Sequence, residues 1–242
     1  MMPDRRPGDG VASAPVARHA NNRVSALPEL LVLDLGGVLF PSAMPGIVAD
    51  VASDVGVDRE RVRRHVDTAL LHALWSGEVS IDVFWARIAS STGAPLSPAR
   101  RARWASRVAA RMRPLPALRC LPVWSRHVRI GILSNHRAEW ARPALARAGV
   151  LDLLDPVLIS SETGCVKPEA DAFAQLERLG VAPSRILYVD DRAAARRGAA
   201  RVGVRTRAAD PAGRWASDLG LLLAGAVRAP TGRSRPPRAG GP

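Results

Sequence analysis

Four short apolar runs, each followed by helix-like sequence, dominate the hydrophobic pattern of the chain. The first, LLVLDLGGVLF, begins at Leu30 and breaks after Asp34 into two glycines, which is typical of a buried parallel strand that ends in a tight loop. The other runs are VRIGILS (128–134), DPVLIS (155–160) and RILYVDD (185–191). Helices are predicted at 138–149, 168–179 and 193–202, with Gly149, Gly180 and Gly203 as their C-terminal stops. This alternation predicts an α/β fold with a doubly wound parallel sheet, completed by an edge strand at 204–206 and a closing helix at 214–225.

The stretch 43–126 lies between the first two predicted strands and has no strand pattern. Val62, Val66, Leu70 and Leu74 form one apolar stripe at helical spacing, and further helices fit 80–91 and 98–112. Pro114, Pro116 and Pro122 mark the return to the sheet, with a short helix between them. An insertion at this point would lie over the carboxyl edge of the sheet, where open α/β folds bind their ligands.

Length and cysteine content favour an ordinary globular protein. A chain of 242 residues can build one principal core without disulfide support. Cys120 and Cys165 are too few for a secreted disulfide framework, and we interpret Cys165 as a packing thiol. We find no apolar leader and no run long enough to cross a bilayer. The sequence therefore predicts a soluble, cytoplasmic protein without a membrane partner.

The net charge of +13 raises the question of nucleic-acid binding, but much of the excess lies near the two ends. Residues 1–28 carry four arginines against two aspartates, and residues 226–242 carry four arginines and no acid. Both tails are rich in Pro, Gly, Ala and Arg without helix or strand periodicity, so we predict that they are disordered. Because no interleaved aromatic residues accompany the arginines, nucleic acid is not the favoured partner.

One basic residue differs from all the others. Lys167 is the single lysine among 35 basic side chains, and the rest are arginines. An ammonium is compact and flexible, whereas a guanidinium is a planar fork. Chance alone also leaves a single lysine somewhere in a sequence, so this observation counts only if separate reasoning also selects Lys167.

The ends of the predicted strands carry side chains suited to phosphoryl transfer. They are Asp34, Ser134, Asn135, Lys167, Asp190 and Asp191. A carboxylate that attacks phosphorus needs compensating positive charge, which an ammonium supplies. Carboxylates from two strand ends also form the oxygen cage that Mg²⁺ prefers. Alternatively, Asp34 caps a loop, and the two later aspartates cap the helix that begins near Ala193.

The motifs LDLGGVLF, ILSNH, CVKPE and YVDD, in this order, resemble motifs I to IV of the haloacid dehalogenase superfamily. The resemblance covers about residues 30–206 and implies an Mg²⁺-dependent hydrolase, a phosphatase of small phosphorylated metabolites. It implies that Asp34 is the nucleophile and that the Gly36 carbonyl and Asp191 bind the metal, with Asp190 in support. Ser134 and Asn135 would then contact phosphate, and Lys167 would act as a charge clamp.

The same resemblance implies a division of the chain into a core and a cap. A Rossmann-like core would comprise 29–42 and 127–225, and 43–126 would form a helical cap of the C1 type with its return helix. The segment LWSGEVSIDVFW also resembles cap sequence of the bacterial sugar-phosphate phosphatases. Trp75, Trp85 and Trp104 in this region are interpreted as packing residues.

Gly36 departs from the family pattern, because phosphatases of this family usually carry an aspartate there as general acid. Loss of a positioned proton donor removes about two to four decades of rate. His136 is the preferred stand-in donor, ahead of His65 and His72, which are more often structural. Two alternatives stay open: a metal-free 2-haloacid dehalogenase, which the acids at 190 and 191 disfavour, and a catalytically weak protein that binds a ligand or partner. The sequence does not predict the substrate or the oligomeric state.

Overall fold

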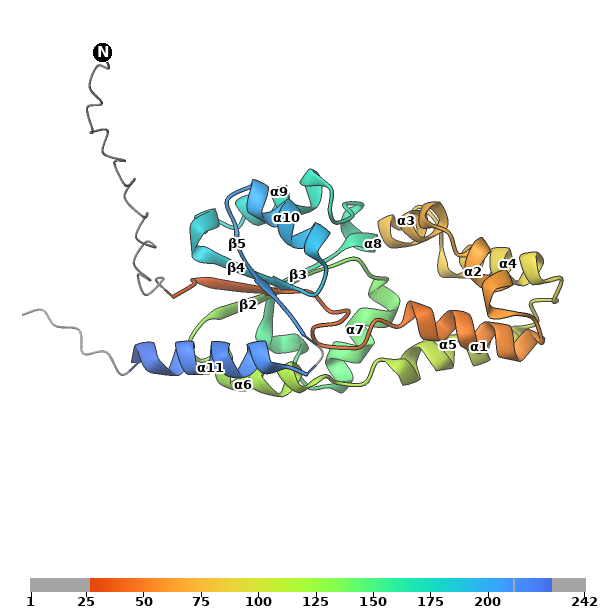
Figure 1. Cartoon of the computed structure of the whole chain (residues 1–242), viewed down its shortest axis with the longest axis horizontal. Helices are drawn as coiled ribbons and strands as arrows, with labels where there is room; N and C mark the ends of the chain where they lie inside the picture. Colours follow the sequence, from red (N-terminus) through yellow and green to blue (C-terminus); the bar gives the residue numbers. More distant parts are fainter. Residues whose placement is uncertain (1–26, 211, 228–242) are drawn as a thin grey trace, which may run out of the picture.

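The computed structural model describes residues 27–210 and 212–227, and in this part of the chain five parallel strands form one sheet in the order β3-β2-β1-β4-β5 (Figure 1). The strands are β1 (Leu30–Leu33), β2 (Arg129–Ser134), β3 (Leu154–Ile159), β4 (Ile186–Asp190) and β5 (Arg205–Ala208). The central position of β1 follows from its sequence, because LLVL is apolar on both faces and all four residues are fully buried.

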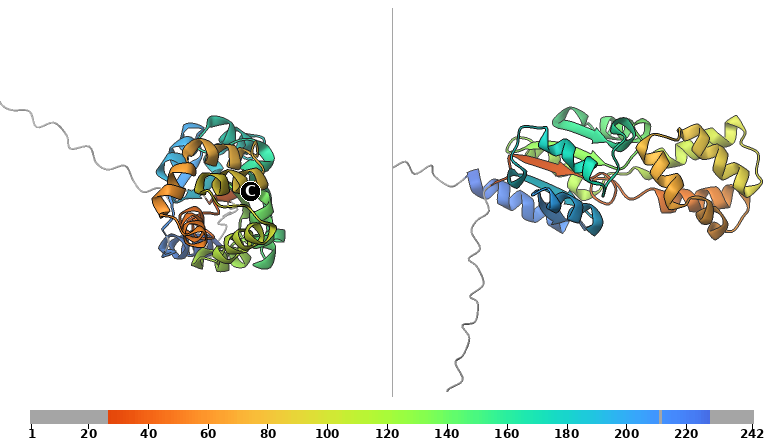
Figure 2. Two further views of the ribbon diagram at one scale, coloured as in Figure 1. Left: turned by 90° about the vertical axis from the view of Figure 1, so that its right-hand side faces the viewer. Right: turned by 90° about the horizontal axis from the view of Figure 1, so that it is seen from above.

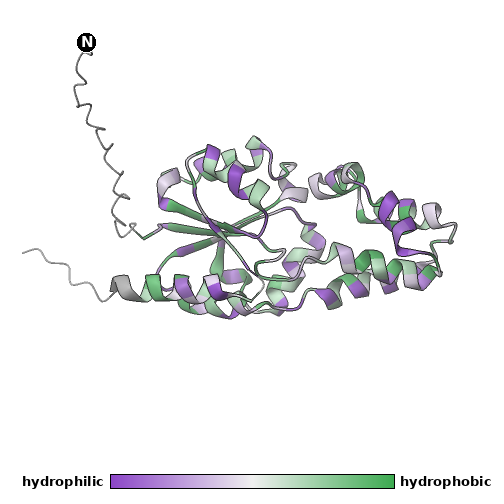
Figure 3. Cartoon of the chain, in the orientation of Figure 1, coloured by the Kyte–Doolittle hydropathy of each residue, from purple (hydrophilic) through white to green (hydrophobic). Residues whose placement is uncertain are grey.

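Alternate residues of the central strands serve two different cores. Leu31 and Leu33 point to a core that they share with η1 (Pro116–Cys120), α6 (Leu121–Trp124), α7 (Ala138–Arg147) and α11 (Arg214–Val227). Leu30 and Val32 point to the opposite core, formed with α9 (Ala170–Glu177) and α10 (Ala193–Arg201). The apolar strands therefore lie inside a three-layer body, and the helices that cover them carry both hydrophilic and hydrophobic residues (Figure 3). Three short elements complete this body: η2 (Leu151–Leu153), α8 (Ser160–Thr163) and η3 (Pro183–Arg185).

A helical lobe, defined here as Met44–Arg111, projects from the carboxyl edge of the sheet (Figures 1 and 2). Its helices are α1 (Met44–Val55), α2 (Arg59–His65), α3 (Thr68–Ser76), α4 (Ile81–Thr92) and α5 (Pro98–Arg111). They enclose a core of their own around the fully buried Trp85 and Trp104. The returning segment η1 and α6 packs on the sheet instead of the lobe.

The α/β fold and the parallel sheet predicted from the sequence are confirmed. Gly149, Gly180 and Gly203 adopt left-handed backbone conformations, as expected of residues that follow the end of a helix. The single stripe predicted from Val62 to Leu74 is wrong as one helix, because α2 ends at His65 and α3 begins at Thr68. Asp67 causes the break: its side chain accepts a hydrogen bond of 2.7 Å from the Leu70 amide and so caps α3.

The predicted tails at 1–28 and 226–242 lie almost entirely outside the described residues. Among the residues that are described, we find no helix with the length and apolarity needed to cross a membrane.

Candidate active site

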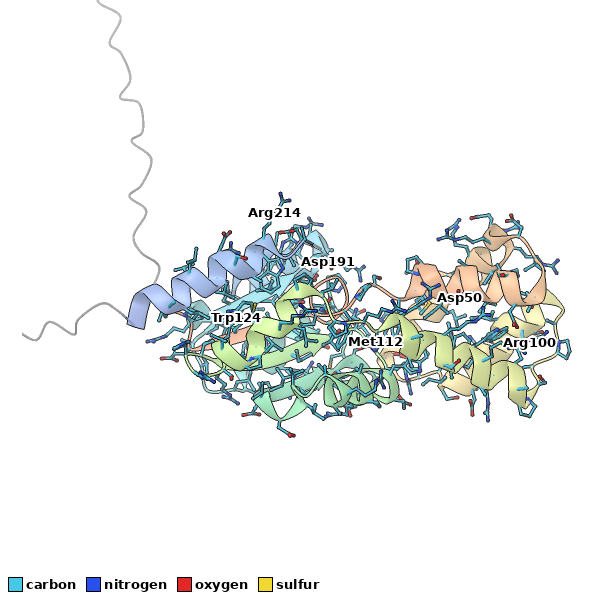
Figure 4. All side chains as sticks on the ribbon, turned by 90° about the horizontal axis from the view of Figure 1, so that it is seen from below. Asp50, Arg100, Met112, Trp124, Asp191 and Arg214 are labelled. Carbon is cyan, nitrogen blue, oxygen red and sulfur yellow. The ribbon has the colours of Figure 1, made fainter. Side chains whose placement is uncertain are left out.

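The carboxyl edge of the sheet brings together the strand-end residues selected from the sequence. Asp34 follows β1 directly, and its amide donates a hydrogen bond of 3.0 Å to the Val189 carbonyl in β4. Ser134 ends β2 and Asp190 ends β4, so these three residues come from neighbouring strands in the middle of the sheet. Asp191 follows Asp190 and lies at the junction between the sheet body and the helical lobe (Figure 4).

The loop after Asp34 is shaped by a glycine that the sequence reasoning did not single out. Gly37 has a left-handed φ of 75°, and its amide donates a hydrogen bond of 2.7 Å to the Phe40 carbonyl. A Cβ atom on Gly37 would collide with the Asp191 carboxylate. Gly36 differs, because a Cβ atom there would have no neighbour within 4 Å. Gly37 is thus required for the close approach of Asp191 to the loop, whereas Gly36 leaves open space.

Lys167 is buried and its ammonium connects the aspartates. Its Nζ donates hydrogen bonds to the Leu133 carbonyl (2.8 Å), the Tyr188 hydroxyl (2.7 Å) and Asp190 Oδ2 (2.9 Å). It also lies 3.0 Å from Asp34 Oδ1. Asp34 Oδ1 thus has a close ionic contact with Lys167, but the geometry gives it no hydrogen bond within the described residues.

Tyr188 is a second site residue that the sequence reasoning missed. Its hydroxyl donates a short hydrogen bond to Asp190 Oδ2. Burial, followed by the negative charges of Asp34 and Asp190, raises the pKa of Tyr188 well above its ordinary value, so the hydroxyl stays protonated. Alternation along a strand puts residues two apart on one face, and the motif YVDD therefore held the signal that Tyr188 and Asp190 point the same way.

The three aspartates have different electrostatic environments. Burial raises the pKa of Asp34. The positive charge of Lys167 lowers this pKa, and the negative charge of Asp190 offsets part of that lowering. Burial, then the charges of Asp34 and Asp190, raises the pKa of Asp191 to about 6. For Asp190 burial acts in the same direction, but Lys167, Tyr188 and the Arg192 amide hold its pKa below the ordinary value.

These carboxylates have the chemistry of a donor set for a divalent cation. Each of Asp34, Asp190 and Asp191 offers an oxygen within 4.8 Å of the others. Both oxygens of Asp190 already accept hydrogen bonds from Lys167, Tyr188 or the Arg192 amide. Asp34 retains a buried oxygen without a hydrogen bond, and Asp191 is exposed. The donor set thus fits a hard cation bound between Asp34 and Asp191, with Asp190 behind them.

Asn135 and Ser134 lie beside this cluster. The Asn135 side chain binds the main chain of Lys167 twice: Nδ2 donates to the carbonyl (2.8 Å) and Oδ1 accepts from the amide (2.8 Å). This positioning of Lys167 was not foreseen from the sequence. The buried Ser134 hydroxyl interacts with Asp34 and acts to lower the pKa of that carboxyl.

None of the three histidines considered as proton donors lies on the wall of the main cavity. The His136 ring packs against Trp75 and Trp140, at centroid distances of 5.7 and 6.1 Å, and burial lowers its pKa, so it is neutral near pH 7. His65 contacts the Arg61 carbonyl in its own helix. His72 forms a 2.9 Å ion-pair contact with Glu169, between the lobe and the sheet body.

A cavity of about 400 Å³ opens above the carboxylates, between the sheet body and the helical lobe. Its floor includes Asp34, Gly36, Asn135, Lys167 and Asp191. The lobe supplies the opposite wall from α1, α2 and α3. A ligand in the cavity would therefore touch the predicted nucleophile, the ammonium and the exposed carboxylate together.

The family of the chain follows from a comparison of its sequence with family models. The model described as haloacid dehalogenase-like hydrolase matches residues 28–203. A phosphatase of Mycobacterium tuberculosis is 36% identical over 110 residues, which are 42% of this chain and 51% of that protein. The chain thus spans about half the length of this curated relative.

Solved structures with a similar fold cover most of the chain. A predicted HAD-like hydrolase from Porphyromonas gingivalis has a TM-score of 0.66 at 22% identity, over 82% of this chain and 98% of that one. A HAD family enzyme from Bacteroides thetaiotaomicron, in complex with magnesium and inorganic phosphate, has a TM-score of 0.65 at 18% identity, over 79% and 98%. The L-2-haloacid dehalogenase from Xanthobacter autotrophicus, with chloropropionic acid covalently bound, gives 0.56 at 21% identity, over 82% and 88%. At these identities the likenesses concern the fold.

Proposed function

The chain belongs to the haloacid dehalogenase-like hydrolases, and from this premise we propose that it is an Mg²⁺-dependent phosphomonoesterase of small phosphorylated metabolites. Asp34 is the nucleophile, and the reaction passes through an aspartyl-phosphate on its carboxylate. The observation that carries this proposal is the charge balance at the floor of the cavity. Three carboxylates lie within reach of one another, and two of them contact the single ammonium of Lys167, so the floor itself carries an excess of negative charge that a bound cation would offset beside an anionic substrate.

Each residue of the floor has a role in this proposal. Asp34 and Asp191, with the Gly36 carbonyl, would hold Mg²⁺, and Asp190 supports them through Lys167. The ion supplies Lewis-acid polarisation of the phosphoryl oxygens. The charge of Lys167 favours the ionised form of Asp34, against the effect of burial, and screens the approach of phosphate to it.

The covalent step is a displacement at phosphorus. Asp34 forms a bond to phosphorus while the bond to the ester oxygen breaks, and the leaving alkoxide takes a proton from water. Water then hydrolyses the acyl phosphate and releases inorganic phosphate. Ser134 and Asn135 lie beside the position of the phosphate group. The helical lobe serves as the cap that excludes bulk water.

Two relatives support the chemistry. The Mycobacterium tuberculosis protein is named a phosphatase, and the Bacteroides thetaiotaomicron enzyme was crystallised with both magnesium and inorganic phosphate. The metal-free dehalogenase reaction is the less favoured alternative, because it has no use for the additional acid at Asp191.

Hydrolysis of p-nitrophenyl phosphate tests the proposal. We expect turnover that requires Mg²⁺, disappears with EDTA, and falls by at least about three decades in Asp34→Asn, which keeps the side-chain shape but is no nucleophile. Trapping of ³²P on the wild-type chain, and not on Asp34→Asn, would identify the covalent intermediate.

The same preparation separates the alternatives. Chloride release from 2-chloropropionate without metal would favour the dehalogenase. Binding of phosphate without turnover of any ester would favour a catalytically inactive binding protein, and either result would contradict the proposal.

A further inference from the structure

The wall of the cavity above the carboxylates is mainly apolar. The side chains that the lobe directs to it, apart from arginines, are Met44, Pro45, Val48, Val66, Leu71 and Trp75. The Trp75 ring is held in place by contacts with His136 and Trp140 at centroid distances of 5.7 and 6.2 Å. Binding of an apolar group here would remove apolar surface of both the ligand and the wall from water. This removal is the main source of affinity for such a surface.

Neutral hydrogen-bonding side chains are few among the described residues that line the cavity. Apart from the indole N–H of Trp75, they are those of Ser42 and Asn135. Asn135 uses both ends of its amide to hold the Lys167 main chain. A sugar hydroxyl placed against the remaining apolar wall would lose its hydrogen bonds to water without replacement, which is costly.

The cavity also contains an excess of cationic groups. Four cationic side chains (Arg59, Arg63, Lys167 and Arg192) line it, against the two carboxylates of Asp34 and Asp191. Lys167 belongs to the catalytic floor, and Arg192 follows Asp191 there. Arg63 is already bound by both oxygens of Glu60, at 2.7 and 2.6 Å.

Arg59 is therefore the cation on the lobe side that is left for a ligand. Its one hydrogen bond among the described residues is a long contact of 3.4 Å to the Pro45 carbonyl. Its charge acts on Glu60, but the hydrogen bonds of that carboxylate go to Arg63. Arg59 belongs to α2, whereas the catalytic residues belong to the sheet edge, so the two ends of a ligand would meet opposite sides of the cavity.

The lobe is fixed to the sheet body where this geometry requires it. The buried Arg137, two residues after Asn135, donates to the Leu74 and Val79 carbonyls (3.2 and 3.3 Å) at the end of α3. Gly77, which ends α3, approaches α8 so closely that a Cβ atom would lie 2.6 Å from the Ser161 carbonyl oxygen. The apolar wall is thus held at a defined height above the catalytic floor.

We propose that the substrate is a phosphate monoester with a largely apolar body and a second anionic group at its far end, and that Arg59 binds this second anion. The inference rests on the proposed phosphatase activity and specifies its substrate class. The reacting phosphate lies on the carboxylate floor, the apolar body lies against Met44, Val48 and Trp75, and the distal carboxylate or phosphate pairs with the guanidinium of Arg59.

Matched synthetic esters test this assignment in the full-length enzyme with Mg²⁺. The first set is 4-propylphenyl phosphate, its 4-(2-carboxyethyl), 4-(2-phosphonoethyl) and 4-(2-aminoethyl) analogues, which have nearly the same phenol leaving group. The second set compares cyclohexylmethyl phosphate with glucose 6-phosphate, two esters of primary alcohols. We expect kcat/KM to rise about tenfold or more for an anionic analogue over the propyl ester, as one charge-assisted hydrogen bond supplies. The carboxyethyl and phosphonoethyl esters distinguish a carboxylate from a phosphate as the distal group.

Three variants connect the preference to Arg59. Arg59→Gln should remove the advantage of the anionic ester, and Arg59→Glu should transfer it to the aminoethyl ester. Arg64→Gln is the matched control, because Arg64 is exposed on the same helix and does not line the cavity, so its preference should equal that of the wild type. The ratio of kcat/KM between esters is the readout, because a general loss of folding would lower all esters together.

The outcomes separate this inference from the proposed function. If the propyl ester is hydrolysed in an Asp34-dependent reaction but the anionic esters gain nothing, or keep their gain in Arg59→Gln, the inference is wrong and the phosphatase activity stands. A preference for glucose 6-phosphate over cyclohexylmethyl phosphate would also overturn it. If no ester is hydrolysed, both are wrong.

Discussion

Replacement of Gly36 by aspartate should supply a general acid to the proposed phosphatase. The structure allows the change, because a Cβ atom on Gly36 has no neighbour within 4 Å and the backbone there is not left-handed. Gly36 lines the same cavity of about 400 Å³ as Asp34 and Asp191, so the new carboxyl group would extend into free space beside the ester oxygen. The two existing carboxylates would raise the pKa of the introduced group, which favours its protonated form near neutral pH.

The size of the effect depends on the leaving group. For an alkyl phosphate, whose alkoxide needs a proton, we expect Gly36→Asp to raise kcat/KM by about two to four decades, the usual contribution of a positioned acid. For p-nitrophenyl phosphate, whose leaving group departs without a proton, the gain should be within about threefold. The assay is kcat/KM over a series of aryl and alkyl phosphates, plotted against the pKa of the alcohol, and the variant should give the flatter line.

Gly36→Asn is the control, because its amide has the shape of the acid but cannot release a carboxyl proton. If Gly36→Asp and Gly36→Asn give the same slope while both bind Mg²⁺, the space beside Gly36 is not where the leaving oxygen lies. The reasoning that assigns the missing proton donor to this position would then be refuted.

Three further predictions concern the floor of the cavity. Lys167→Met should lower the free energy of unfolding by about 3–5 kcal/mol in urea titrations, because it leaves the buried Asp190 without its counter-charge; an effect below about 1 kcal/mol would contradict a charged pair. Gly37→Ala should abolish turnover and weaken Mg²⁺ binding by calorimetry, since the added Cβ displaces Asp191, and Gly56→Ala, at a left-handed position with free space around it, is the control for backbone strain alone. The pKa of Asp191 is raised to about 6, so the metal-free protein should lose stability as the pH rises from about 4 through 6, and the increase of Tm on addition of Mg²⁺ should be small at pH 5 and full above pH 7. Equal Tm increases at both pH values would show that Asp191 does not titrate as a ligand.

Much of the fold could be predicted because the hydrophobic periodicity of the chain agreed with the positions of its glycines and prolines at the ends of elements. The run of LLVL before Asp34 is apolar at every position, and it occupies the fully buried centre of the sheet. The helical stripe from Val62 to Leu74 misled for a physical reason: all four of its apolar residues are buried in the core of the lobe, so periodicity alone shows no interruption. The interruption comes from the capping side chain of Asp67, a local hydrogen bond that outweighs the continuity of the stripe.

The site was predictable to the extent that it lies at strand ends. The sheet topology brings Asp34 and Asp190 together, since Asp34 follows β1 and Asp190 ends the neighbouring parallel strand β4. The cavity wall was not predictable, because Arg59 and Trp75 reach it only through the packing of the lobe on the sheet body. Likewise, the hydrogen bonds from Asn135 to the main chain of Lys167 depend on two loops 32 residues apart in sequence.

The choice of lysine at position 167 connects the composition of the chain to its chemistry. One nitrogen atom lies within 3.0 Å of four oxygens: those of Leu133, Tyr188, Asp190 and Asp34. Such an arrangement needs a point charge at the centre of its acceptors, whereas a guanidinium distributes its charge over a plane with donors along the edge. Elsewhere the chain uses arginine for every basic position. The only lysine of the sequence therefore occupies a position where four acceptors surround a single atom, and that position lies against the proposed nucleophile.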